Sequence, residues 1–145
     1  MSNRPADLDG SIILLVDGVT DPQNLGALIR SAYCFGAGGV VIPVHRAVGV
    51  TPAVMKASAG AAHRIPVVGA VNLVQTMEEM KRHQYWIYGA SASAGQDLEA
   101  IPFEGNVALV VGSEGKGLRP LVRRQCDILC SIPMVGEMDS LNEIG

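Results

Sequence analysis

A glycine-rich segment from Gly112 to Gly117 follows an apolar run and holds the carboxylate of Glu114 among its glycines. Glycines at the end of a strand let the backbone approach a ligand closely, and free N–H groups at the start of a helix attract anions. The spacing fits neither a Walker A loop nor a Rossmann fingerprint. The segment therefore indicates a nucleotide-like ligand, with a plain tight turn as the alternative.

A second group of polar residues lies between Asp17 and Arg30, with Asn24 near the start of an expected helix. Arg30 follows Asn24 by six residues, which places it roughly 9 Å further along the helix axis. Leu25 and Leu28 have the spacing of a face that packs on a core. The amide and the guanidinium can serve a binding site, or they can be a helix cap and a surface charge.

A third segment runs from Ile132 to Asn142, where an apolar strand leads into a loop that contains Ser140 and Asn142. Their hydroxyl and amide groups can each donate and accept hydrogen bonds to a ligand. The alternative is a plain C-terminal coil.

The charges of the chain are unevenly distributed. The net charge is -3, which argues against avid non-specific binding of nucleic acid. However, no Asp or Glu occurs between Pro22 and Met77, a stretch that carries Arg30, Arg46, Lys56 and Arg64. Such a basic stretch predicts a local site for a phosphate or a polyanion, and chance clustering on a solvated face is the alternative.

Apolar runs alternate with helical patterns along the chain. We expect strands at residues 11–16, 39–42, 67–68, 85–90, 106–111 and 128–132, and helices at 20–36, 51–59, 72–82 and 118–125. Several of these strands are apolar throughout, which is typical of a parallel sheet covered on both faces. The prediction is an α/β fold with a mostly parallel sheet and helices on both faces. Ligands of such folds bind beyond the carboxyl ends of the strands, where the polar segments fall.

Length and composition set further bounds. The chain has 145 residues, of which 48% are hydrophobic and 17% are charged, so we expect one domain with a substantial core. No apolar run approaches the roughly 20 residues of a membrane span, and no secretory signal is present. The cysteines Cys34, Cys126 and Cys130 then indicate reduced core thiols in a cytoplasmic protein. The high apolar fraction favours burial of one face against a partner.

Taken in their order along the chain, the three segments resemble the SpoU (TrmH-like) branch of the SPOUT RNA 2'-O-ribose methyltransferases, from about Ile12 to Asn142. The segment from Asp17 to Arg30 carries D-x-x-x-D-P-x-N-x-G-x-x-x-R. The glycine-rich segment carries G-S-E-G after its apolar strand, and the segment from Ile132 to Asn142 carries I-P-M and S-L-N. The residues from Lys56 to Ala62 are also similar to the family's helix over the site. The middle of the chain resembles most the bacterial 23S rRNA guanosine-2'-O-methyltransferases.

The resemblance implies a SPOUT-type α/β knot and a methyl transfer from S-adenosyl-L-methionine to a ribose 2'-hydroxyl of structured RNA, with rRNA favoured over tRNA. The cofactor-binding residues that it implies are Gly112, Ile132, Ser140 and Leu141. The catalytic residues that it implies are Arg30, Asn24, Glu114 and Asn142. We expect the RNA to contact Arg30, Arg46 and Lys56. The resemblance also implies a homodimer with the site near the subunit interface, and neither a metal nor a membrane takes part.

The chemistry of this reaction sets its own requirements. A ribose hydroxyl is a weak acid that must lose its proton during attack, and it must lie in line with the methyl group and the sulfur. Arg30 is the base in the family's proposed mechanism. Because a guanidinium keeps its proton in most proteins, the other role for Arg30 is to bind the adjacent phosphate and stabilise developing negative charge.

The expected organisation is a polar tail at residues 1–10 and a catalytic domain at residues 11–145. Many family members carry an N-terminal RNA-binding domain, which we expect to be absent here. In the family, S-L-N leads into a helix, whereas here only three residues follow Asn142. We expect that helix to be missing, which leaves closure of the knot open. The alternatives are a non-catalytic RNA-binding protein, a truncated and inactive fragment, or a generic nucleotide-binding α/β enzyme.

Overall fold

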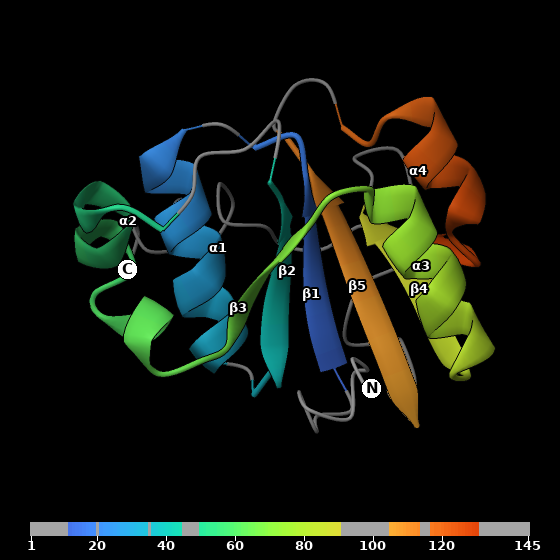
Figure 1. The fold of residues 1–145 in the computed structure, drawn as a ribbon, viewed down its shortest axis with the longest axis horizontal. Coiled ribbons are helices and arrows are strands. Elements are labelled where there is room, and N and C mark those ends of the chain that lie inside the picture. The colour runs from blue at the N-terminus through green and yellow to red at the C-terminus, as the bar shows by residue number, and fades with distance from the viewer. Residues whose placement is uncertain are drawn as a thin grey trace.

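The computed structural model describes residues 12–19, 21–34, 36–44, 50–90, 105–113 and 117–130. In these residues six parallel strands form one sheet with the order β3-β2-β1-β5-β4-β6 (Figure 1). The strands are β1 (Ile12–Asp17), β2 (Gly39–Pro43), β3 (Val67–Ala70), β4 (Tyr85–Ala90), β5 (Asn106–Gly112) and β6 (Ile128–Cys130). The predicted parallel sheet is therefore confirmed.

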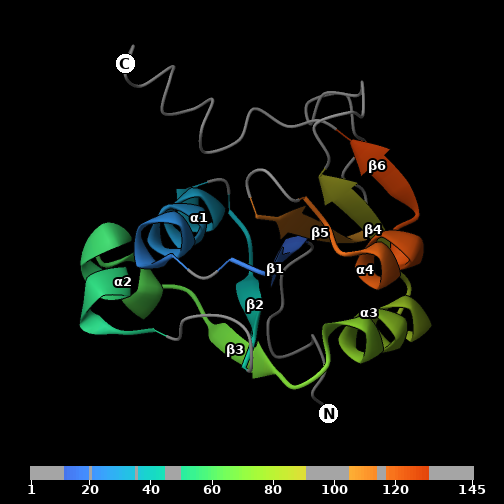
Figure 2. The same cartoon turned by 90° about the horizontal axis from the view of Figure 1, so that it is seen from above.

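Helices cover both faces of the sheet, as predicted. Helices α1 (Pro22–Cys34) and α2 (Pro52–Ala57) lie on one face together with a short 3₁₀ helix (Ala61–His63), and α3 (Leu73–Arg82) and α4 (Pro120–Gln125) lie on the other (Figure 2). The knot implied by the resemblance involves residues after Cys130, which lie outside the described residues. It stays a prediction.

Strands β1 and β5 form the middle of the sheet, where their apolar sequences predict burial. Ile13 and Leu15 point to the α3 and α4 face, and Leu14 and Val16 point to the α1 and α2 face. All four are at most 2% exposed. Because successive side chains of a strand alternate between faces, a strand that is apolar throughout fills both core layers.

Side-chain caps begin two of the helices. The Thr51 hydroxyl accepts a hydrogen bond from Val54 N at 3.2 Å, and Pro52 occupies the first helical position. The Asn72 side chain accepts a hydrogen bond from Gln75 N at 3.0 Å. Each cap satisfies a backbone donor that the first turn of its helix leaves without a partner.

Two element boundaries differ from the prediction for local reasons. Helix α2 ends at Ala57 because Ala59 and Gly60 take positive φ values of 55° and 84°, a conformation that ends a helix. Helix α4 begins at Pro120, later than predicted, because the residue before a proline is driven out of the helical region. Arg119 is accordingly extended, with φ -67° and ψ 151°.

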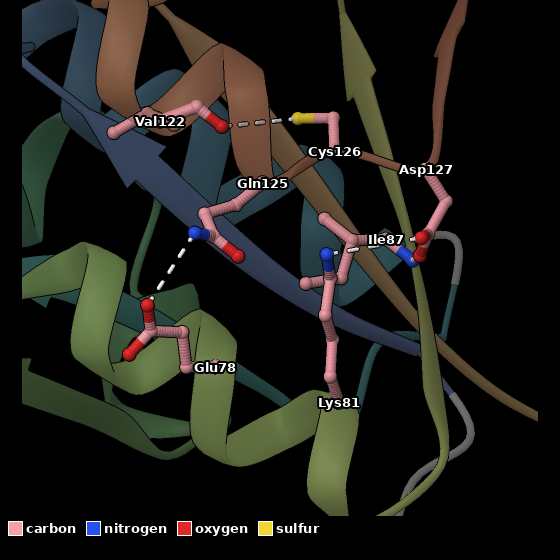
Figure 3. Close-up of polar contacts among 7 residues, drawn as sticks. All are labelled: Glu78, Lys81, Ile87, Val122, Gln125, Cys126 and Asp127. Carbon is pink, nitrogen blue, oxygen red and sulfur yellow. Dashed lines mark hydrogen bonds and ion pairs between the residues drawn. The ribbon is translucent and has the colours of Figure 1, made fainter.

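Strand β6 is held at the edge of the sheet by Asp127 (Figure 3). The Asp127 carboxylate accepts a hydrogen bond from Ile87 N at 2.8 Å, and the Asp127 backbone N donates to Ile87 O at 2.7 Å. Lys81 Nζ lies 3.8 Å from the same carboxylate, and Gln125 of α4 donates to Glu78 of α3 at 3.4 Å. These contacts join α3, α4 and β6 to β4.

The predictions for the cysteines are partly wrong. Cys34 is exposed at the end of α1 and is not a core thiol, and Cys126 is partly buried. Among the described residues, no three His, Cys, Asp or Glu side chains gather as a metal site would require. None of the described helices is long and apolar enough to cross a membrane.

Candidate active site at the switch point of the sheet

Neighbouring strands β1 and β5 lead to helices on opposite faces of the sheet. After β1 the chain enters α1, whose Leu25, Leu28 and Ile29 pack on one face. After β5 it enters α4, whose Val122 packs on the other. Such a divergence is the topological switch point of an open α/β sheet, and ligands bind in the crevice that it creates. The first and second polar segments of the sequence both meet there.

Gly112 ends β5 at this switch point. It is the register partner of Asp17 at the end of β1. A Cβ at Gly112 would overlap the carbonyl of Gly117 and would lie 2.7 Å from Leu118 N. The loop therefore folds back over the strand end, and Gly117 N donates to Ser113 O at 2.8 Å to close it. Only glycine permits this close approach.

Asp17 is a buried carboxylate at the same strand end, and its side chain is 0% exposed. Its Oδ2 accepts a hydrogen bond from Arg119 N at 2.9 Å, and its Oδ1 accepts one from Arg119 Nε at 2.6 Å. The Arg119 side chain is 48% exposed. This ion pair crosses the switch point from the end of β1 to the start of α4.

The start of α1 is capped by Asp21, so the simple interpretation of Asn24 as a helix cap is wrong. The Asp21 carboxylate accepts a hydrogen bond from Asn24 N at 3.1 Å, and Asp21 O accepts one from Leu25 N at 2.9 Å. The side chain of Asn24 is exposed, and no hydrogen bond among the described residues occupies it. Its amide is available to a ligand near the switch point.

Helices α1 and α2 cross closely at Gly26. A Cβ at this position would overlap the side chain of Ala57 and would lie 2.9 Å from the backbone N of Ser58. Arg30 lies four residues after Gly26, about one helical turn, and Lys56 precedes Ala57. Arg30 of α1 and Lys56 of α2 come from different parts of the sequence, and the crossing places their helices side by side.

Arg30 and Lys56 are exposed cations. Neither forms an ion pair within the described part of the chain. The stretch from Pro22 to Met77, which includes both helices, contains no Asp or Glu. The surface of α1 and α2 consequently presents positive charge to solvent.

The other predicted site residues lie outside the described residues. This applies to Glu114 of the glycine segment, to Arg46, and to the C-terminal group Ile132, Ser140, Leu141 and Asn142. The structure thus brings together the ends of the first two segments, and it places Arg30 further along α1.

Sequence reasoning missed the Asp17–Arg119 ion pair and the role of Gly26. The two members of the pair are 102 residues apart, and an exposed arginine before a proline gives no signal of its partner. The sequence pattern included Gly26 only as the glycine of the D-x-x-x-D-P-x-N-x-G-x-x-x-R motif, without a structural role. A glycine in the middle of a helix costs about 0.5–1 kcal/mol relative to alanine, and this cost could have indicated a close packing contact.

The described residues define an α/β protein with a parallel sheet and a topological switch point between β1 and β5. Residues 11–143 match the SpoU rRNA Methylase family. The chain belongs to this family. The resemblance deduced from the motifs is thereby confirmed.

Curated relatives of the chain share close to half of its aligned residues. The 23S rRNA (guanosine-2'-O-)-methyltransferase RlmB of Xylella fastidiosa is 47% identical over 132 residues, which are 91% of this chain and 53% of the relative. RlmB of Ralstonia nicotianae is 45% identical over 131 residues, 90% of this chain and 53% of the relative. The chain thus spans about half the length of the curated relatives that it matches.

Solved structures share the fold. The SpoU methyltransferase AviRb from Streptomyces viridochromogenes, in complex with the cofactor AdoMet, has a TM-score of 0.75 and 28% identity, covering 88% of this chain and 53% of AviRb. The AdoMet-bound rRNA methyltransferase from Sinorhizobium meliloti has a TM-score of 0.73 and 27% identity, covering 92% of this chain and 51% of that protein. The six-stranded arrangement is therefore that of SPOUT methyltransferases.

Proposed function

We propose that this chain is the catalytic part of an enzyme that transfers a methyl group from S-adenosyl-L-methionine to a ribose 2'-hydroxyl, with a guanosine of 23S rRNA as the substrate. The observation that carries the proposal is the switch point, where Gly112 and Asp17 end neighbouring strands that lead to opposite faces. Family membership and two AdoMet-bound neighbours support it. The target nucleoside is that of the RlmB relatives.

The described residues fit the cofactor. The backbone of Gly112 lies at the carboxyl edge of the sheet, and Gly117 approaches it so closely that no side chain fits at position 112. Ile132, Ser140 and Leu141 complete the proposed cofactor site. The bound cofactor supplies an electrophilic methyl group on a sulfonium.

Arg30 acts on the RNA in this proposal. Its guanidinium is exposed, and it forms no ion pair among the described residues. It binds the phosphate next to the target ribose in a bidentate manner, orients the 2'-hydroxyl and stabilises the negative charge that develops on its oxygen. Asn24, Glu114 and Asn142 line the same cleft and hold the nucleotide by hydrogen bonds.

Binding of S-adenosyl-L-methionine and methylation of RNA test the function directly. We expect micromolar binding by calorimetry and the transfer of a labelled methyl group to the 2'-hydroxyl of a guanosine in a 23S rRNA fragment. A fragment with a 2'-deoxy substitution at that guanosine is the matched control, because it removes only the nucleophile. Failure of the chain to bind the cofactor would refute the proposal.

The RNA contacts predict a change in salt dependence. Lys56→Glu and Arg46→Glu should each weaken RNA binding and make the slope of log K against log salt shallower by about 0.7–0.9 per lost phosphate contact. Arg82→Glu is the control, because Arg82 is an exposed cation of α3 on the opposite face of the sheet. Filter binding between low and moderate salt measures both quantities. An unchanged slope in both test variants would exclude this RNA surface.

The proposed assembly is a cytoplasmic homodimer with its two sites near the subunit interface. The high apolar content of the chain, 48%, supports burial of one face against a partner. Sedimentation would report the mass of the assembly.

A further inference from the structure

One residue, Asp17, contacts the chain at both ends of the glycine loop. The backbone of Asp17 pairs in register with Gly112, where the loop begins. The side chain of Asp17 accepts two hydrogen bonds from Arg119, two residues after Gly117, where the loop ends. The segment between Gly112 and Arg119 is thus anchored at its entrance and its exit by a single residue of β1.

The arginine contributes something beyond its backbone. Any residue at position 119 except proline would supply the N–H that reaches Asp17 Oδ2 at 2.9 Å. Only a side chain with a correctly placed donor reaches Oδ1, as Arg119 Nε does at 2.6 Å. The two bonds together fix the orientation of the carboxylate and of the chain where it leaves the loop.

Stability alone is a weak reason for such a pair. Removing a carboxylate from water is costly, and this cost offsets most of the attraction to its partner, so buried ion pairs are often replaceable by apolar residues without loss. The pair instead crosses the switch point, beside the loop whose backbone is proposed to contact the cofactor. Holding that backbone before the ligand arrives reduces the entropy cost of binding.

We infer that Arg119, held by Asp17, is a positioning residue for the cofactor loop of this enzyme. The inference rests on the proposed function. Arg119 fixes the chain directly after Gly117, so that Gly117 keeps its close approach to Gly112, where the cofactor is proposed to bind. The neighbouring Arg123 and Arg124 are exposed and form no ion pair among the described residues, and they take no part in this.

Hydrogen exchange and calorimetry test the inference on the full chain. Arg119→Ala keeps the backbone donor and removes only the Nε bond, and Arg119→Lys restores a cation. The control is Arg123→Ala, which removes an unpaired arginine from α4, the helix that follows Arg119. We expect Arg119→Ala to speed exchange of the Gly117 amide, which donates to Ser113 O. It should weaken binding of S-adenosylhomocysteine about tenfold. Arg119→Lys should recover part of both effects, and Arg123→Ala should change neither.

Each outcome decides a separate point. Unchanged exchange at Gly117 in Arg119→Ala would overturn the inference. Faster exchange with unchanged affinity would overturn it too, because the pair would then be structural only. Failure of the unaltered chain to bind S-adenosylhomocysteine would refute the proposed function, and the exchange result would still decide whether Arg119 holds the loop.

Discussion

Replacing Arg30 with alanine should lower the rate of methyl transfer by about a thousandfold, while the dissociation constant of S-adenosyl-L-methionine changes less than about threefold. Arg30 is exposed and forms no ion pair within the described residues, so the stability of the fold should change by no more than about 0.5 kcal/mol. Single-turnover methylation, calorimetry and urea unfolding measure the three quantities. Loss of cofactor binding as large as the loss of rate would contradict this assignment.

The control for this variant is Arg82→Ala. Arg82 is an exposed arginine in the last turn of α3, on the other face of the sheet, and its replacement should leave the rate unchanged. RNA affinity then separates the two roles considered for Arg30. A phosphate clamp binds the RNA before the reaction, so its loss should weaken RNA binding as well as the rate. A pure proton acceptor would affect the rate alone.

Local patterns predicted the elements and the fold class well, because apolar runs, helical spacing and chain breakers are features of residues close in sequence. The apolar runs of β1 and β5 required burial on both faces, and a parallel sheet with helices on both sides is the arrangement that provides it. The helices expected to start at residues 51 and 72 begin one residue later, at Pro52 and Leu73, each after a residue whose side chain caps it. The switch point follows from the order of the strands, which no local pattern contains.

The contacts that build the site depend on distant residues. Asp17 was predicted to end a strand, but nothing near it in sequence indicated that Arg119 would satisfy its carboxylate. Asn24 was considered as a cap, whereas Asp21 is the residue that caps α1. The roles of Glu114 and Asn142 came from the family resemblance, and they stay predictions because both residues lie outside the described residues.

Replacing Gly112 with alanine should damage the cofactor site more than it damages the fold. The added methyl group would overlap the backbone of Gly117, and backbone cannot move aside as a flexible side chain can. Overpacking of this kind costs about 1–3 kcal/mol in the free energy of unfolding. The loop can relieve the overlap only by leaving the strand end, so we expect cofactor binding to fall at least about a hundredfold, the equivalent of about 2.7 kcal/mol.

Gly105→Ala separates the loss of stability from the loss of the site. Gly105 lies before β5, far along the strand from the loop, and a Cβ there would meet no atom within 4 Å. Its φ of +74° makes alanine unfavourable by about 1–2 kcal/mol. In urea unfolding, this variant should therefore lose a free energy of unfolding similar to that lost by Gly112→Ala. In calorimetry, it should bind the cofactor as the unaltered chain does. If Gly112→Ala bound S-adenosyl-L-methionine as well as Gly105→Ala does, the folded-back loop would not be the cofactor site. The two glycines thus distinguish a backbone conformation needed for folding from a close approach needed for binding.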